Sequence, residues 1–143
     1  MPIANYTTQV PADNSAAEIE KMLRVHNATD ILKRYENGEL CSLTFIVPTR
    51  LGKTPFSLPA NIDAVHKVLE RQHVKANIER SQARRVAWRI LRDWVRAQMA
   101  IIDTEMVNID EVFMPYIALS SKRTFYQALQ DGTLKLPQQG TPG

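Results

Sequence analysis

The sequence contains only one cysteine, Cys41, among its 143 residues, so no disulfide can form within the chain. A lone cysteine is typical of a reducing intracellular compartment, and we expect a cytoplasmic protein. The first residues lack the charged and apolar regions of a signal peptide, and no run approaches the roughly 18 apolar residues of a membrane span. We therefore expect neither secretion nor a membrane partner.

Catalytic signatures are lacking as well. The stretch Gly52–Thr54 is similar to the end of a phosphate-binding loop, but Val47 occupies the position where that loop requires its first glycine. Cys41 falls in a strand pattern on the same face as Leu43 and Phe45, which favours an inert buried thiol over a nucleophile. Because the sequence offers no base, nucleophile and orienting residue together, we expect a protein that is not an enzyme.

Metal ligation has one weak candidate. His66, Glu70 and His73 recur at i, i+4 and i+7, so one helix face could present three metal-compatible groups. Nothing in the sequence places a further ligand beside them, and a polar outer helix face explains the same spacing. The sequence therefore predicts no bound metal and no cofactor.

The composition that is present, with 44% hydrophobic and 23% charged residues, is typical of one globular domain. The first residues are expected to be extended, because Tyr6–Val10 favours β structure and Pro11 ends it. We divide the chain into an arm, a single domain and a flexible tail. The arm spans residues 1–14, the domain spans residues 15–137 and the tail spans residues 138–143. Within the domain we expect an α-β-β-β-α part over residues 15–72 and a helical part over residues 81–131.

Local signals predict the order of helices and strands. Ser15 and Glu18 have the spacing of a capping box, and Asn37-Gly38 is a dipeptide that favours a tight turn between two strands. Helices are expected over residues 15–26, 62–72, 81–106, a short stretch after Asn108, and 124–130, and strands over 30–36, 39–47 and 54–58. The predicted fold class is α+β, a three-stranded antiparallel meander with helices mainly on one face and one long central helix.

The expected long helix carries two adjacent apolar stripes that together cover more than half of its circumference. The first stripe comprises Trp88, Leu91, Val95, Met99, Ile102 and Met106, and the second comprises Ala83, Ala87, Ile90, Trp94, Ala97 and Ile101. Such a helix must contact two layers, such as its own sheet and either another helix or a second copy of the chain. Because the alanines of the second stripe allow close approach, we expect a homo-oligomer, specifically a dimer.

Four arginines fill the remaining narrow stripe of this helix: Arg85, Arg89, Arg92 and Arg96. Their spacing spreads them along about 16 Å of helix, a span that matches several backbone phosphates. Residues 67–96 carry nine Lys or Arg against three acidic residues, whereas residues 97–118 carry four acidic residues and no Lys or Arg. This segregation of charge favours either an anionic partner or pairing of opposite charges between copies of the chain. A charged stripe is also typical of a solvated helix face.

These patterns support three functional hypotheses. The leading one is a non-enzymatic protein that binds a polyanion, either a nucleic acid or an acidic protein surface, through the four arginines helped by Lys67, Arg71 and Lys75. The alternative is a protein-interaction module that inhibits or adapts a host complex. Its contact residues would be Phe113, Met114, Tyr116, Phe125 and Tyr126, and residues of this kind more often pack short terminal helices on the core. The third is a small-nucleotide sponge in which arginines from two copies enclose the phosphates.

Two resemblances add to this interpretation. The order helix, three strands, helix over residues 15–72 resembles the topology of the double-stranded RNA-binding domain. Three further segments, residues 56–63, 85–91 and 110–116, look like parts of small uncharacterised proteins encoded by phages and prophages. That second resemblance implies a mobile-element setting, with either nucleic-acid handling or interference with a host machine as the role.

Overall fold

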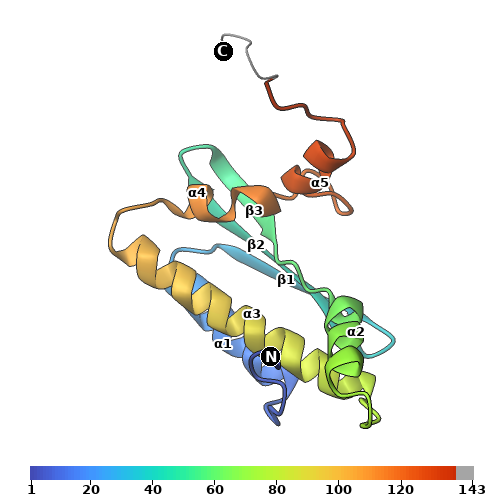
Figure 1. The fold of residues 1–143 in the computed structure, drawn as a ribbon. Coiled ribbons are helices and arrows are strands. Elements are labelled where there is room, and N and C mark those ends of the chain that lie inside the picture. Colours follow the sequence, from blue (N-terminus) through green and yellow to red (C-terminus); the bar gives the residue numbers. More distant parts are fainter. Residues whose placement is uncertain (138–143) are drawn as a thin grey trace.

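Three antiparallel strands form a sheet in the order β1-β2-β3, and helices α1 and α3 cover one of its faces (Figure 1). The computed structural model describes residues 1–137. Its elements are α1 (Ala12–Val25), β1 (Asp30–Glu36), β2 (Glu39–Thr49), β3 (Gly52–Ser57), α2 (Ile62–Gln72), α3 (Arg80–Asp103), α4 (Ile109–Phe113), the 3-10 helix η1 (Met114–Tyr116) and α5 (Phe125–Gln130). The predicted α+β class, with its meander and one long helix, is confirmed. No helix within residues 1–137 has the length and apolar character needed to cross a membrane.

The turn between β1 and β2 is the one that the sequence predicts. Asn37 and Gly38 both have positive φ angles, 51° and 76°, which is the conformation that matches the twist of the flanking strands. From this turn the strands pair in register, with Ile31 opposite Phe45 and Glu36 opposite Glu39. The meander therefore forms from a local signal at its first turn.

One position in β2 differs from the prediction. Arg34 lies opposite Ser42, but Tyr35 lies opposite Leu40, so Cys41 has no partner and forms a β-bulge. The extra residue shifts the inward position from Cys41 to Leu40, which is only 2% exposed. Cys41 is instead partly exposed, and its thiol donates to the carbonyl of Arg34 at 3.3 Å. The expectation that Cys41 shares the buried face of the strand is wrong.

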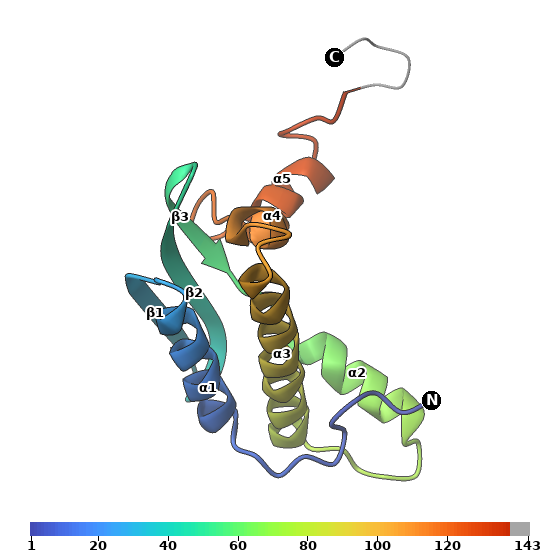
Figure 2. The same ribbon diagram turned by 90° about the vertical axis from the view of Figure 1, so that its left-hand side faces the viewer.

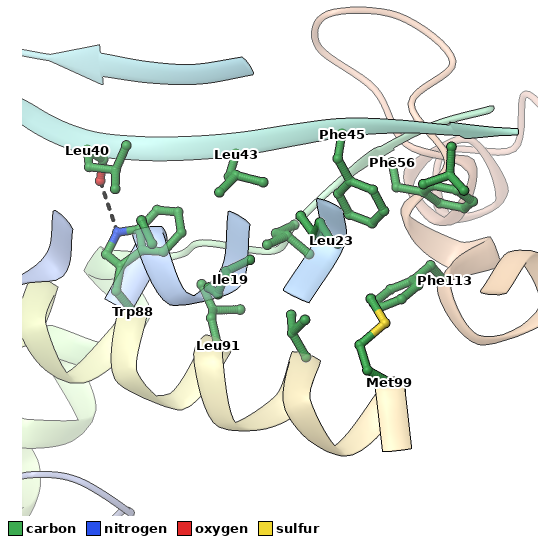
Figure 3. Packing of buried hydrophobic residues seen from close by; sticks show 14 of the residues in the cluster. Ile19, Leu23, Leu40, Leu43, Phe45, Phe56, Trp88, Leu91, Met99 and Phe113 are labelled. Carbon is green, nitrogen blue, oxygen red and sulfur yellow. Dashed lines mark hydrogen bonds between the residues drawn. The ribbon is translucent and has the colours of Figure 1, made fainter. Parts of the chain in front are cut away.

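The main core lies between the sheet, α1 and α3 (Figure 3). The first stripe of α3 supplies one wall, with Trp88, Leu91, Val95 and Met99 all at most 7% exposed. The indole N–H of Trp88 donates to the carbonyl of Leu40 at 3.2 Å, which satisfies a polar group inside an apolar environment. Met106, which we assigned to this stripe, lies beyond the end of α3 and is 70% exposed.

A second cluster lies between α2 and the first half of α3. Ile62 and Leu69 of α2 pack against Ala83 and Ala87, which are at most 4% exposed. The other helix that covers the second apolar stripe is therefore α2, and these two alanines are not available to a second copy of the chain. Ala97, in the other half of the stripe, is exposed.

The N-terminal segment is less extended than predicted. α1 begins at Ala12 after Pro11, and Ser15 lies inside the helix, fully buried, so it does not form the predicted cap. The preceding residues dock on their own chain, because the Gln82 side chain of α3 donates to the carbonyls of Tyr6 and Thr8 at 3.1 and 3.0 Å. The helix therefore begins three residues before its predicted start at residue 15, and we use the name N-terminal arm for residues 1–11.

The C-terminal part follows the predicted order of short helices. Capping boxes at Asn108 and Thr124 start α4 and α5, and both helices begin where the sequence places them. A single β-bridge, between Phe56 and Ile117, joins this part to the edge of the sheet. The predicted flexible tail, residues 138–143, lies outside the described residues.

Candidate polyanion-binding face

The arginine stripe lies along the solvent side of the junction between α1 and α3. The two helices run in the same direction, because Glu18 in the middle of α1 contacts α3 at Arg89, and His26 at the end of α1 contacts Asp103 at 2.8 Å. Arg85, Arg89 and Arg92 are partly exposed and Arg96 is exposed. Together with the exposed Lys21 of α1 they form what we call the arginine face.

Glu18 occupies the centre of this face. Arg89 donates to one oxygen of the Glu18 carboxylate at 2.5 Å, and Arg92 contacts the other oxygen at 3.3 Å. Arg92 also pairs with its neighbour Asp93 at 3.0 Å. Two of the four predicted phosphate-binding arginines are therefore engaged within their own fold.

Both carboxylates of the face are held in their ionised form. Burial acts to raise the pKa of the Glu18 carboxyl, but the hydrogen bonds and charges of Arg89 and Arg92 outweigh burial and hold the pKa below its usual range. The pKa of Asp93 is lowered in the same way, because burial raises it but the hydrogen bonds from Asn5 and Arg92, together with the charges of Arg92 and Arg89, outweigh burial. At neutral pH both groups therefore act as fixed internal anions.

The other two arginines differ from this pair. Arg85 donates to the side-chain oxygen of Gln82 at 2.9 and 2.6 Å, so a neutral acceptor orients it without removing its charge. Arg96 is exposed and forms no ion pair with any residue from 1 to 137. Lys21 lies one turn beyond Glu18 on α1, where residues three apart are neighbours on the helix surface.

The three additional cations of the hypothesis lie elsewhere. Lys67, Arg71 and Lys75 are exposed on α2 and the loop after it. The N-terminal arm crosses between α2 and α3, because Ile3 donates to Gln72 of α2 at 3.0 Å and Asn5 donates to Asp93 of α3 at 2.8 Å (Figure 2). The arm separates these three residues from the four arginines, so the seven cations do not form one stripe.

The residues proposed for protein interaction divide into core and surface groups. Phe113 is fully buried, and its ring lies 5.4 Å from that of Trp94, so it serves the core. Tyr116 and Phe125 are partly buried, whereas Met114 and Tyr126 are 38% and 55% exposed. Sequence reasoning did not single out three further exposed apolar residues of the same region: Leu119, Leu134 and Leu136.

The three spaced metal-compatible residues do not converge. The His66 ring contacts the carbonyl of Ile78 at 2.8 Å, and His73 stacks on Tyr6 with ring centroids 5.0 Å apart. Residues 1–137 contain no group of three potential ligands that could hold a metal ion. His66 and His73 therefore fasten a loop and the N-terminal arm to α2.

Comparison with protein-family models, with curated proteins and with solved structures finds no match. The chemistry of the arginine face itself therefore indicates what the protein binds. The key partner of this face, Glu18, was missed by sequence reasoning. Glu18 lies 71 residues before Arg89 in the chain, and no local pattern connects the two positions.

Proposed function

We propose that the protein is a non-enzymatic binding protein that engages a nucleic acid through the arginine face of α1 and α3. The observation that carries this proposal is the excess of positive charge on one ordered surface. The basic side chains of this face, those of Arg85, Arg89, Arg92, Arg96 and Lys21, outnumber the carboxylates that pair with them, those of Glu18 and Asp93. Such a surface attracts a polyanion over about one Debye length, roughly 8 Å at physiological ionic strength.

The arrangement of the four arginines strengthens the proposal. Among the four arginines, Arg85 is held by the neutral side-chain oxygen of Gln82, so it loses less conformational freedom when it binds a ligand than a mobile side chain does. The long helix spaces the four along about 16 Å, which is commensurate with phosphates along a backbone. The contacts would position the protein on a backbone without reading its base sequence.

Arg96 provides the test, because its substitution removes a charge without breaking an ion pair with any residue the structure describes. A labelled DNA duplex and a single-stranded RNA are titrated between about 50 and 200 mM salt. Wild-type binding should weaken steeply with salt, and Arg96→Ala should flatten the slope on the duplex by about 0.9. Lys122→Ala, which removes an exposed charge in the loop before α5, is the matched control and should leave the slope unchanged.

Absent or salt-insensitive binding to both probes would overturn the proposal. Measurements on the same samples test two further expectations. Light scattering gives the mass of the protein alone, and a mass of one chain would contradict the expected dimer. Thermal stabilisation by cyclic nucleotides without binding to either long probe would favour the small-nucleotide sponge.

A second candidate function is supported by the apolar surface of the C-terminal part. Tyr126, Leu119 and Leu136 are 55%, 52% and 72% exposed, and exposed apolar groups of this kind are typical of protein-interaction surfaces. A pull-down that survives nuclease treatment should recover one stoichiometric protein with the wild type and lose it with Tyr126→Ser. Leu32→Ser, at a 59% exposed position on β1, is the control.

A further inference from the structure

We infer that Glu18 is an internal competitor that occupies the arginine face and sets how strongly a phosphate backbone binds there. This inference rests on the proposed nucleic-acid binding and assigns a regulatory role to one residue of the same face. The carboxylate lies where an external anion would bind, between two arginines on successive turns of α3. Binding of a phosphate to Arg89 and Arg92 requires that Glu18 move away.

The geometry of the contact supports this role. Each oxygen of the carboxylate faces a different guanidinium group, Arg89 on one side and Arg92 on the other, as two oxygens of a bridging phosphate would. The Glu18 side chain is 43% exposed, whereas those of Arg89 and Arg92 are 20% and 18% exposed. Glu18 is therefore more exposed than either arginine with which it pairs, and its charge faces an approaching anion.

The ion pairs of Glu18 are weak enough for a phosphate backbone to displace its carboxylate. An ion pair of this exposure is weak, since water screens the attraction and holding both side chains costs entropy. A phosphate backbone offers repeated charges and releases counterions when it binds several arginines at once, whereas an isolated small anion offers neither. The Glu18 contact thus excludes small anions more effectively than polymers, and it selects for a ligand that also reaches Arg85 and Arg96.

Glu18→Gln removes the charge of the competitor and keeps its size. We expect this variant to bind the DNA duplex about tenfold more tightly than the wild type at low salt, comparable to one added charge-assisted contact. Because Arg89 is released from its ion pair with Glu18 and Arg92 keeps only its pair with Asp93, the slope of binding against salt should steepen by about 1 to 2. Adding Arg89→Ala to Glu18→Gln should remove most of this gain.

Glu20→Gln is the matched control, since it makes the same change of net charge two residues away on the same helix. Glu20 pairs with Lys33 of β1 at 3.4 Å, on the sheet side of α1 and away from the arginine face. Glu20→Gln should shift affinity by much less than Glu18→Gln and leave the slope unchanged. Equal gains for both variants would overturn the inference, because they would show an effect of net charge alone.

The outcomes separate the two proposals. If neither the wild type nor Glu18→Gln binds either probe, the proposed function fails. If the wild type binds and Arg96→Ala weakens it, but Glu18→Gln binds with unchanged affinity and slope, only the role of Glu18 fails. Thermal unfolding of each variant confirms that the compared proteins are folded.

Discussion

The part of the molecule built from α1, the sheet and α3 uses its apolar side chains differently from the part after α3. Trp88 and Phe45 in the first part are completely buried, whereas Tyr126 and Leu136 in the second are 55% and 72% exposed. In the first part, α1, the sheet and α3 pack around one core. The second consists of short helices that reach this core mainly through Phe113.

The comparison teaches that most of the large, fully buried side chains belong to the first part of the chain. Burial of large side chains stabilises the first part, and it also fixes the helix that carries the four arginines. The second part contributes Phe113 to the core, with Ile109, Val112 and Ile117 partly buried against it, and it leaves Leu119, Tyr126 and Leu136 more than half exposed. Substitutions in the two parts should therefore have very different effects on unfolding.

The largest effect is expected for Trp88→Ala. It empties the centre of the first part and leaves the carbonyl of Leu40 without its donor, so the free energy of unfolding should fall by about 4 kcal/mol. Urea denaturation measures this loss. Trp88→Phe keeps a ring and should cost about half as much, and a loss below about 1 kcal/mol for Trp88→Ala would show that α3 is not the centre of the core.

Phe113→Ala should come next, with a loss of about 3 kcal/mol. Because this ring packs against Phe45, Phe56 and Trp94, its removal should detach residues 109–137 before the rest of the chain unfolds. Hydrogen exchange measured by peptide should show faster exchange in these residues and little change in α1 and α3. Uniformly faster exchange would mean that the two parts unfold as one unit.

Glu18→Gln tests the ion pairs between Glu18 of α1 and the arginines of α3. The free energy of unfolding should fall by about 0.5 kcal/mol at neutral pH, since water screens these ion pairs. The folded pKa of Glu18 is depressed, so its contribution is present above the unfolded value of about 4.3 and is lost as pH falls through the lower folded value. Urea unfolding should show the wild type and the variant converging in acid. A difference that persists there would have a cause other than the charge.

The smallest effect is expected for Tyr126→Ser, in the second part. More than half of this side chain is in contact with water, so the free energy of unfolding should change by less than about 0.5 kcal/mol. The melting temperature should therefore stay close to that of the wild type. A loss of more than about 1 kcal/mol would show that α5 is part of the cooperative core.

Features with local causes were predictable from the sequence. The Asn37-Gly38 turn, the Asn108 and Thr124 helix starts and the buried row of α3 each follow from residues close together in the chain. Conformational preferences and helical spacing act over a few residues, so the order of helices and strands was largely correct. The sequence predicted that the second apolar stripe of α3 requires a second packing layer. It did not identify α2 as the helix that supplies this layer.

Features with distant causes were not predictable. Ser15 has the spacing of a cap, but packing of α1 on the core buries it and moves the helix start to Ala12. The bulge at Cys41 depends on how two strands align, which a face pattern alone does not encode. The ion pairs of the arginines were not predictable either, because Glu18, which engages Arg89 and Arg92, lies on another helix.

The bulge in β2 also makes the molecule easy to label. Cys41 is a free, partly exposed cysteine on the β1–β2 hairpin, while the arginine face lies on α1 and α3. Since the sequence has one cysteine only, a maleimide fluorophore attaches at a single known place, and no engineered cysteine is needed. Fluorescence anisotropy of the dye-labelled wild type and its charge variants can then be compared on equal terms.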